Sequence, residues 1–271
     1  MTLLLSWIGI DSRSPSSIYL ASDSRINWQG KVNFDYARKV FGCKEFPEIF
    51  GYCGDVLFPS IVLSQIVELI DKGFLIQKDW SYEEKSHAIF TKIIQSFNEY
   101  PSEILTSPIQ ILHCSRDNER NFYCNKIEWE LATKKWRGEI KKISKYSDKL
   151  FVLGSGGKEF LNRYDLYQSS EENFLNWRTS RTVFHCFCDT LSNIKDVNCG
   201  GPPQLTGLYR INNSQIYGII QNSKRYFQGI DISNLTNFDN IEWRNENFEI
   251  CDGNTLQRKV SAQKQPNPLM R

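Results

Sequence analysis

The sequence predicts an α+β fold in which two β-sheets are stacked between layers of helices. Short apolar runs bounded by turn residues, which are typical of strands, occur in three groups along the chain. Two blocks of helical periodicity separate these groups, and each block holds a pair of amphipathic segments. Because sheets and helices bury one face against another element, this order favours stacked layers.

The first half of the chain opens with an expected β-hairpin, because two apolar runs flank a stretch rich in Asp, Ser and Pro. Further on, strand patterns give way to two helical patterns, the second ended by Pro101. The expected elements are strands at residues 3–10, 18–21, 38–41 and 49–53, then helices at residues 56–72 and 82–100.

The second half also has strand patterns followed by a pair of helical patterns, and further strand patterns follow these. A Gly-rich turn at residues 154–157 should start a helix that reaches Tyr167. The Ser-Ser-Glu-Glu stretch at residues 169–172 predicts the start of the next helix, with acidic residues at its positive end. That helix would carry one apolar stripe, made of Phe174, Trp177, Phe184, Phe187, Cys188 and Leu191. The expected strands are residues 109–114, 121–130, 136–143, 150–153, 204–211, 215–220 and 225–229.

Domain organisation follows from a change in composition near residue 233. Residues 1–232 carry the apolar patterns and are expected to form one domain, since no internal linker or repeat interrupts them. Residues 233–271 are predicted to form a polar C-terminal extension. Residues 252–271 contain no apolar cluster and are not expected to pack as core.

Composition argues against several classes of function. The 271 residues carry a formal net charge of only +2, which gives no electrostatic case for nucleic acid or an acidic membrane. No apolar run approaches the roughly 20 residues that span a bilayer. The run at residues 3–10 lacks the flanks of a signal peptide. We therefore expect no nucleic-acid partner and no membrane partner.

The eight cysteines are scattered and mostly lie in apolar surroundings. In a chain without a secretion signal they are typical of reduced thiols, which indicates a cytoplasmic protein. His185, Cys186 and Cys188 invite a zinc interpretation, but neighbours two apart on a helix point to different faces. We expect no metal and no cofactor.

The second residue is a threonine, Thr2. Initiator Met is normally removed before so small a residue, and removal would leave Thr2 with a free α-amine beside its own hydroxyl. An N-terminal Thr then carries nucleophile and base on one residue, because the amine can take the hydroxyl proton. By itself, a Thr at this position is a weak signal.

Further segments resemble the proteasome β subunits and the bacterial HslV-type peptidase. Residues 21–25 read Ala-Ser-Asp-Ser-Arg, close to that family's Ala-Ala-Asp-Ser-Arg. Asp23 precedes Lys39 by 16 residues, as in the family, and Lys39-Val40 matches its Lys-Val. Three later stretches also resemble family motifs: residues 51–54, residues 154–157, and the Asp-Val-Asn-Cys-Gly-Gly at residues 196–201. The order of these motifs, over residues 2–220, carries the resemblance.

The resemblance implies an N-terminal-nucleophile (Ntn) hydrolase with a four-layer αββα fold. Thr2 Oγ would attack a carbonyl, with its own α-amine as the base. Lys39 would stand beside Thr2 as an ammonium that favours the developing alkoxide, and Asp23 would keep Lys39 charged and oriented. Ser155 and Asp196 would fix the amine and complete the proton path.

The resemblance also assigns substrate-binding positions. Backbone N–H groups of Cys53 and Gly54 would form the oxyanion hole, and Gly51 would line the first side-chain pocket. Asn27 stands where the family has a Thr that aligns the substrate backbone. Cys199 replaces a Ser of the family motif and is a poorer proton relay.

The expected function is that of a threonine-type peptidase that cleaves peptides or unfolded proteins through an acyl-enzyme. The resemblance further implies a homo-oligomer, in the form of a ring, and an ATP-dependent unfoldase as a partner. Two alternatives stay open at this stage. One is a catalytically silent subunit that keeps the fold as a scaffold. The other is an Ntn amidohydrolase acting on a small amide.

Overall fold

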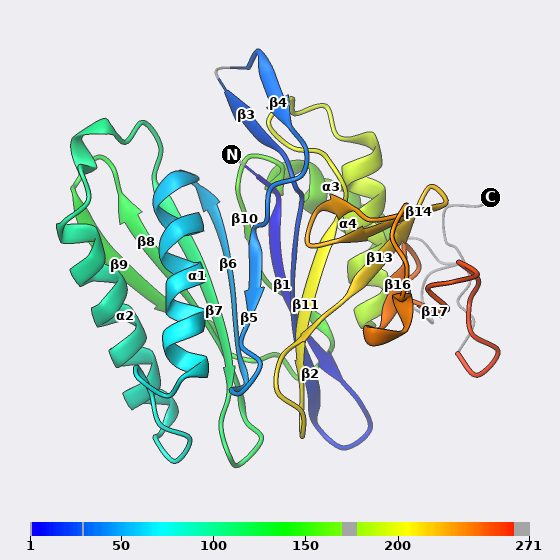
Figure 1. Cartoon of the computed structure of the whole chain (residues 1–271), viewed down its shortest axis with the longest axis horizontal. Helices are drawn as coiled ribbons and strands as arrows, with labels where there is room; N and C mark the ends of the chain where they lie inside the picture. The colour runs from blue at the N-terminus through cyan, green and yellow to red at the C-terminus, as the bar shows by residue number, and fades with distance from the viewer. Residues whose placement is uncertain (1, 29, 170–177, 263–271) are drawn as a thin grey trace.

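The computed structural model describes residues 2–262, except residue 29 and residues 170–177. Two sheets lie face to face at its centre, with one pair of helices outside each sheet (Figure 1). The helices α1 (Leu57–Asp71) and α2 (Tyr82–Asn98) cover one sheet. The helices α3 (Gly157–Ser169) and α4 (Ser180–Asn193) cover the other. The predicted layering is therefore confirmed.

The sheet beneath α1 and α2 is an antiparallel meander in the order β5-β6-β7-β8-β9. Its strands are β5 (Val40–Gly42), β6 (Glu48–Gly54), β7 (Ile109–Arg116), β8 (Phe122–Glu130) and β9 (Lys135–Ile140). Both helices lie within two residues of their predicted bounds. Ser81 and Glu84 form a reciprocal capping box at the start of α2, which fixes where that helix begins.

The sheet beside α3 and α4 has the order β10-β1-β2-β11-β12. Its strands are β1 (Leu4–Ile10), β2 (Pro15–Ser22), β10 (Asp148–Leu153), β11 (Gln204–Tyr209) and β12 (Gln215–Ile216). The expected N-terminal hairpin is thus formed by β1 and β2, which pair antiparallel. Neither strand lies at an edge of this sheet.

Three apolar clusters hold the layers together. Leu4 of β1 and Leu112 of β7 belong to the cluster between the two sheets. Phe50 of β6 packs in a second cluster with α1 and α2, and Trp7 of β1 in a third with α3 and α4. Burial of apolar area at about 25 cal/mol per Å² makes these clusters the main source of stability.

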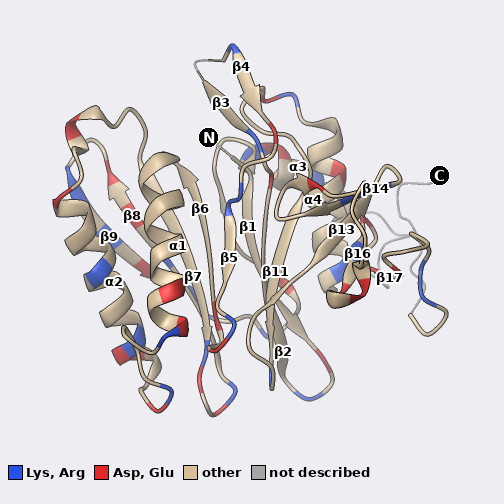
Figure 2. Ribbon diagram, in the orientation of Figure 1, with Lys and Arg blue, Asp and Glu red and all other residues tan. Residues whose placement is uncertain are grey.

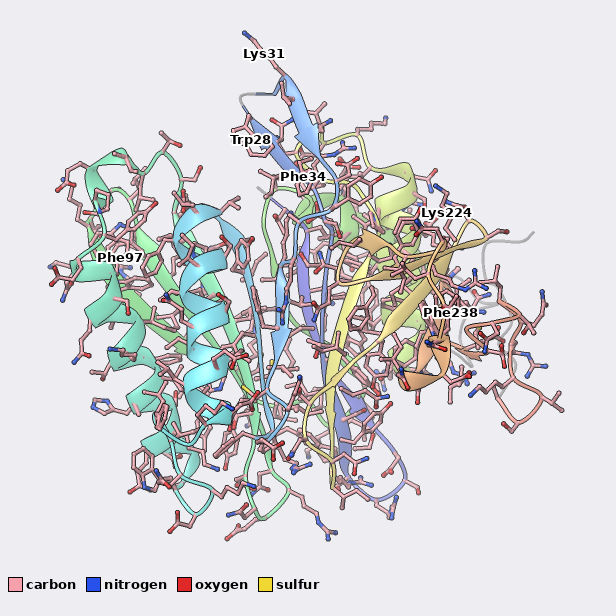
Figure 3. The ribbon with its side chains drawn as sticks, viewed as in Figure 1. Trp28, Lys31, Phe34, Phe97, Lys224 and Phe238 are labelled. Carbon is pink, nitrogen blue, oxygen red and sulfur yellow. The ribbon has the colours of Figure 1, made fainter. Side chains whose placement is uncertain are left out.

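A two-stranded hairpin projects from one end of the sheets. It consists of β3 (Ile26–Trp28) and β4 (Val32–Phe34), and the sequence patterns did not predict it. Figure 3 shows Trp28 and Phe34 on this hairpin, with Lys31 near its tip. Each strand has only three residues, too few for a clear alternation of apolar and polar side chains.

The prediction of one strand at residues 215–220 is wrong, because Tyr217 separates β12 from β13 (Gly218–Gln221). β13 begins another sheet, with the order β15-β14-β13-β16-β17. Its other strands are β14 (Lys224–Phe227), β15 (Ile230–Asp231), β16 (Trp243–Asn245) and β17 (Ile250–Cys251). Short 3₁₀ turns occupy Ser102–Ile104 and Phe238–Asn240.

Part of the polar segment after residue 233 belongs to this small sheet. β16 pairs parallel with β13, and Trp243 is only 2% exposed. Leu256 packs against the cluster of Trp243 and Phe238, so the expectation that residues 252–271 pack against no core is wrong for Leu256. The physical reason is that two large aromatic side chains, rather than an apolar run, supply the core here.

The second helical pair differs from its prediction at one boundary. α3 continues to Ser169, so no helix starts there. α4 begins at Ser180, where the side chain of Thr179 accepts a hydrogen bond from the N–H of Thr182. The predicted start at residues 170–172, with Phe174 and Trp177, lies outside the described residues. Phe184, Phe187, Cys188 and Leu191 are buried on α4 as expected.

Basic and acidic residues are interspersed along the helices and loops in Figure 2. Among the helices that the structure describes, none is both long and apolar enough to cross a bilayer. All eight cysteines are buried and free. Within the described ranges, no cluster of three or more His, Cys, Asp or Glu side chains is placed to hold a metal ion.

Candidate active site

Five segments far apart in the sequence meet at the end of the sheets from which the β3–β4 hairpin projects (Figure 1). Thr2 directly precedes β1, and Asp23 directly follows β2, the partner of β1. Lys39 directly precedes β5 on the facing sheet. Ser155 lies in the turn between β10 and α3, and the loop between α4 and β11 carries Asp196.

Lys39 is the centre of this arrangement. Its ammonium donates hydrogen bonds to Thr2 Oγ1 at 2.7 Å, to Asp23 Oδ1 at 2.9 Å and to the backbone carbonyl of Arg25. An ammonium has three donors, so all of its hydrogen-bonding capacity is used. The Lys39 and Asp23 side chains are fully buried, and Thr2 is 1% exposed. A positive charge this close to the Thr2 hydroxyl, shielded from water, favours an alkoxide there.

Both oxygens of the Asp23 carboxylate also accept hydrogen bonds. Its Oδ1 accepts from the N–H of Leu3 at 3.2 Å as well as from Lys39. Its Oδ2 accepts from the N–H groups of Arg25, at 3.2 Å, and Gly200, at 3.0 Å. Because Leu3 follows Thr2 in the chain, the same carboxylate positions both the ammonium and the backbone beside the nucleophile.

The backbone of Thr2 is held from the other side by the glycine turn before α3. The N–H of Gly156 donates to the Thr2 carbonyl at 3.3 Å. Gly154 has φ +86°, and a Cβ at that position would lie 1.9 Å from the Thr2 carbonyl oxygen. This position therefore requires glycine both for its left-handed conformation and for its close approach to Thr2.

Ser155, Asp196 and Cys199 form a second group next to this centre. Ser155 Oγ and Asp196 Oδ2 each lie 3.6 Å from Cys199 Sγ. Burial tends to raise the pKa of Asp196, but hydrogen bonds from Ser155, Asn198 and Cys199 outweigh it, so the pKa is lowered. Burial, with the negative charges of Asp23 and Asp196, raises the pKa of Cys199 to about 12. Cys199 is therefore a neutral thiol at physiological pH.

Asn27 and Gly51, two of the predicted substrate-binding positions, make local structural contacts. Both groups of the Asn27 side-chain amide are used within the β3–β4 hairpin, by Asn33 and by the N–H of Gly30. A Cβ on Gly51 would meet Leu4 at 2.8 Å, so this glycine lets the two sheets approach closely. These contacts give both residues a local structural role that the sequence did not reveal.

Cys53 and Gly54 form the end of β6, on the facing sheet. The Cys53 thiol hydrogen-bonds to Gln110, and burial raises its pKa to about 12, with smaller contributions that include those of Lys39 and Asp23. Gly54 has φ +92°, and its backbone passes close to the carbonyl of Pro108. The assignment of their N–H groups to an oxyanion hole stays a prediction.

Gln204 is a residue that sequence reasoning missed. Its side-chain oxygen accepts from the N–H of Lys39 at 3.0 Å. Its amide nitrogen donates to the carbonyls of Asp23 and Ala37 and to Ser24 Oγ, at 3.2, 2.7 and 2.8 Å. Gln204 thus ties together the segments that carry Asp23 and Lys39. A lone Gln at the start of a strand has no signature that would have identified it.

Arg25 and Asp35 were also missed as positioning residues. The Arg25 guanidinium binds both carboxylate oxygens of Asp35, at 2.7 and 2.9 Å, and donates to the carbonyls of Val197 and Cys199. This bidentate pair connects the base of the projecting hairpin to the loop of Asp196. The Asp-Ser-Arg motif is the signal that could have drawn attention to Arg25.

Two solved structures are similar to this chain. The chain is similar to the structure of Anbu (ancestral beta-subunit) from Yersinia bercovieri, with a TM-score of 0.53 and 10% sequence identity, over 79% of this chain and 86% of that one. It is also similar to eukaryotic HslV from Trypanosoma brucei, with a TM-score of 0.48 and 10% identity, over 76% of this chain and 99% of that one. No protein-family model and no curated sequence matches.

At this sequence identity the similarity shows the fold alone, and the Anbu structure gives the higher TM-score of the two. The chain has a four-layer αββα sandwich, the fold that the sequence resemblance implied.

Proposed function

We propose that this chain is a threonine-type peptidase of the Ntn class, with Thr2 as its nucleophile after removal of Met1. The observation that carries the proposal is the fully buried Lys39–Asp23 ion pair, with the ammonium 2.7 Å from Thr2 Oγ1. A desolvated ion pair is costly unless a function or excellent geometry compensates for it. Here its ammonium is directed at the hydroxyl of a residue that processing would place at the N-terminus.

In the proposed reaction, every proton is taken up or given back by the Thr2 α-amine, the substrate or water. The Thr2 α-amine takes the hydroxyl proton as Oγ bonds to the substrate carbonyl carbon, and Lys39 stabilises the developing negative charge. The protonated amine then gives its proton to the departing amine of the substrate, and the peptide C–N bond breaks. Water, deprotonated by the same amine, hydrolyses the resulting ester and restores Thr2.

Supporting roles follow from the contacts already described. Asp23 orients the Lys39 side chain, and we assign Ser155 and Asp196 to the proton path around the amine. Cys199 lies between these two and is a poorer proton relay than a hydroxyl, because a thiol is a weak hydrogen-bond donor and acceptor. The N–H groups of Cys53 and Gly54 are proposed to bind the oxyanion. The substrate pocket is proposed to lie near Gly51 and Asn27, with backbone rather than amide contacts at Asn27.

We further propose a homo-oligomer in the cytoplasm that acts on peptides or unfolded proteins. The eight free, buried cysteines support a reducing compartment. The exposed aromatic side chains of the β3–β4 hairpin support self-association. An ATP-dependent unfoldase remains the proposed partner for protein substrates, on the strength of the sequence resemblance.

The proposal is tested by assaying a fluorogenic peptide library with the processed protein and with Thr2→Ala and Thr2→Ser. All three sequences permit Met1 removal, and N-terminal sequencing checks it. We expect cleavage by the parent chain, none by Thr2→Ala and partial activity in Thr2→Ser, which keeps a hydroxyl. Cleavage of small amides but not peptides would favour an amidohydrolase. A processed chain that cleaves neither would favour a scaffold.

A further inference from the structure

We propose that a groove between α1 and the outer edge of β5 is a binding site for a long-chain carboxylate, such as a fatty acid. The groove has a volume of about 890 Å³, within the usual range for ligand sites. It is separate from the Thr2 centre, since neither Thr2 nor Lys39 lines it. Ligand binding in this groove therefore does not depend on peptidase activity at Thr2.

The walls of the groove suit a hydrocarbon chain. Apolar side chains come from β5, from α1 and the turn after it, and from β12 and β14 of two further sheets. They are Phe41, Val67, Leu69, Phe74, Ile216 and Phe227. Phe74 is 78% exposed, although such a side chain gains stability when it is covered.

Arg38 supplies a positive charge to this groove. Its guanidinium lies 4.2 Å from the centroid of the Phe41 ring, and its Nε donates to the Val40 carbonyl at 3.2 Å. Among the residues that the structure describes, no carboxylate lies within ion-pair distance of Arg38. Burial lowers the pKa of Arg38, so its charge is poorly solvated where it stands. A ligand carboxylate would balance this charge and accept from its remaining donors.

The distribution of acidic groups sets the orientation of the ligand. Asp71 also lines the groove, but its oxygens already accept from the N–H groups of Lys44 and Glu45, at 2.9 Å each. Glu68 and Asp71 lie near Cys43, whose pKa is raised by burial and by nearby carboxylates that include these two. Both carboxylates line the groove near Cys43, which follows the end of β5, and Lys44 and Lys72 line it with them. The carboxylate should bind at Arg38, with its chain running along α1.

The edge of β5 favours a hydrocarbon chain over a peptide strand. A peptide that extends a sheet needs free backbone acceptors along the edge. Here the Val40 carbonyl of β5 already accepts from the Arg38 side chain. Just after the strand, the carbonyls of Cys43 and Lys44 accept from the side chains of Ser214 and Asn213. A hydrocarbon chain requires no such acceptors and uses only the apolar walls.

The test is isothermal titration of the full chain with dodecanoate, below its micelle concentration. We expect one molecule bound per chain. Arg38→Met keeps the apolar stem and should weaken binding by roughly 10-fold or more, as expected for loss of a charge-assisted hydrogen bond. Lys72→Met, a matched loss of a groove lysine, should change affinity by less than about 3-fold, because an exposed charge contributes little. Dodecyltrimethylammonium should bind at least about 10-fold more weakly than dodecanoate.

Gln65→Trp fills the groove from the exposed face of α1 and keeps the proposal testable if Arg38→Met does not fold. Binding should be lost in this variant, with an unchanged circular dichroism spectrum. Absence of dodecanoate binding by the parent chain would overturn the proposal, as would equal binding in Gln65→Trp. Binding lost in Gln65→Trp but unchanged in folded Arg38→Met would overturn the carboxylate assignment.

Discussion

At the scale of single residues, the stability of the site depends on complete hydrogen bonding of two buried charges. The Lys39 ammonium has three acceptors, and the Asp23 carboxylate accepts from three N–H groups in addition to Lys39. Removing one partner of a buried ion pair costs about 3–5 kcal/mol, because the other charge stays buried. The pair is therefore expected to make the site rigid as well as reactive.

Lys39→Met removes the ammonium but retains most of the side-chain volume. We expect turnover to fall by roughly 10³-fold or more, as is typical when a group that stabilises charge in the reaction is lost. Lys85→Met is a matched control, since Lys85 is also buried, at 2% exposure, but lies on α2 away from the site. Peptide turnover and thermal unfolding are measured for both. Unchanged turnover in folded Lys39→Met would contradict the mechanism.

Asp196 gives the site a predictable response to acid. Its folded pKa is lowered, so its carboxylate stabilises the fold above the unfolded value near 4, and that contribution is lost as the pH falls through the folded pKa. Ser155→Ala removes one donor and should raise the pKa of Asp196. Carbon-13 titration of the Asp196 carboxyl measures this shift. An unchanged titration would show that Ser155 does not interact with Asp196 in solution.

The candidate site residues that could be predicted from the sequence are those whose spacing carries a signature. Thr2, Asp23 and Lys39 meet as predicted, at hydrogen-bond distances. Gln204 could not be found in this way, because its contacts are to backbone groups that any sequence supplies. The use of the Asn27 amide by Asn33 also depends on the register of the hairpin, which was not predicted.

At the scale of elements, the turn between β10 and α3 positions the start of β1. Gly154→Ala would place a methyl group 1.9 Å from the Thr2 carbonyl oxygen, at a left-handed φ of +86°. Gly73→Ala is the matched control, with φ +69° and open space around it. We expect Gly73→Ala to cost about 1–2 kcal/mol for conformation alone. Gly154→Ala should cost about 1–3 kcal/mol more for the clash.

Turnover should separate these two glycine variants more sharply than stability does. Displacing Thr2 by about 1 Å is expected to lower turnover roughly 10²-fold, whereas Gly73→Ala should leave it unchanged. Urea unfolding and peptide hydrolysis measure both effects. If Gly154→Ala retained full activity, Thr2 would not be held by this turn.

Elements with long periodic patterns were predicted well, and short ones were not. α1 and α2 show helical periodicity over 15 and 17 residues, enough to define one buried face each. β15, β16 and β17 have only two or three residues, so their pairing depends on Trp243 and its surroundings rather than on a local pattern. The separation of β12 from β13 at Tyr217 likewise could not be predicted, because the chain passes from one sheet to another there.

At the scale of the whole molecule, the projecting hairpin has one apolar face and one polar face. Ile26 pairs with Phe34 and Trp28 with Val32, so these four side chains share a face. Trp28 is 53% exposed and Val32 60%. Figure 3 shows Trp28 and Phe34 on the hairpin. An apolar face on a projecting ribbon is expected to be covered when copies of the chain associate.

The Trp28→Ser/Phe34→Ser double variant should therefore shift the assembly to smaller species. Ile211→Ser/Val260→Ser is the matched control, because Ile211 and Val260 are also exposed, at 73% and 100%, but lie on other segments. Light scattering coupled to size-exclusion chromatography gives the mass of each. An assembly that survives the hairpin variant, or a monomeric parent chain, would rule out this interface.

The most direct test of Thr2 as the nucleophile is the intact mass of the natively purified protein, before and after treatment with a peptide epoxyketone. This reagent requires a free α-amine and a hydroxyl on the same residue. We expect a chain that lacks the mass of Met1 and gains a single adduct, which Thr2→Ala does not form. Retained Met1, or a processed chain that forms no adduct, would contradict the assignment of Thr2 as the nucleophile.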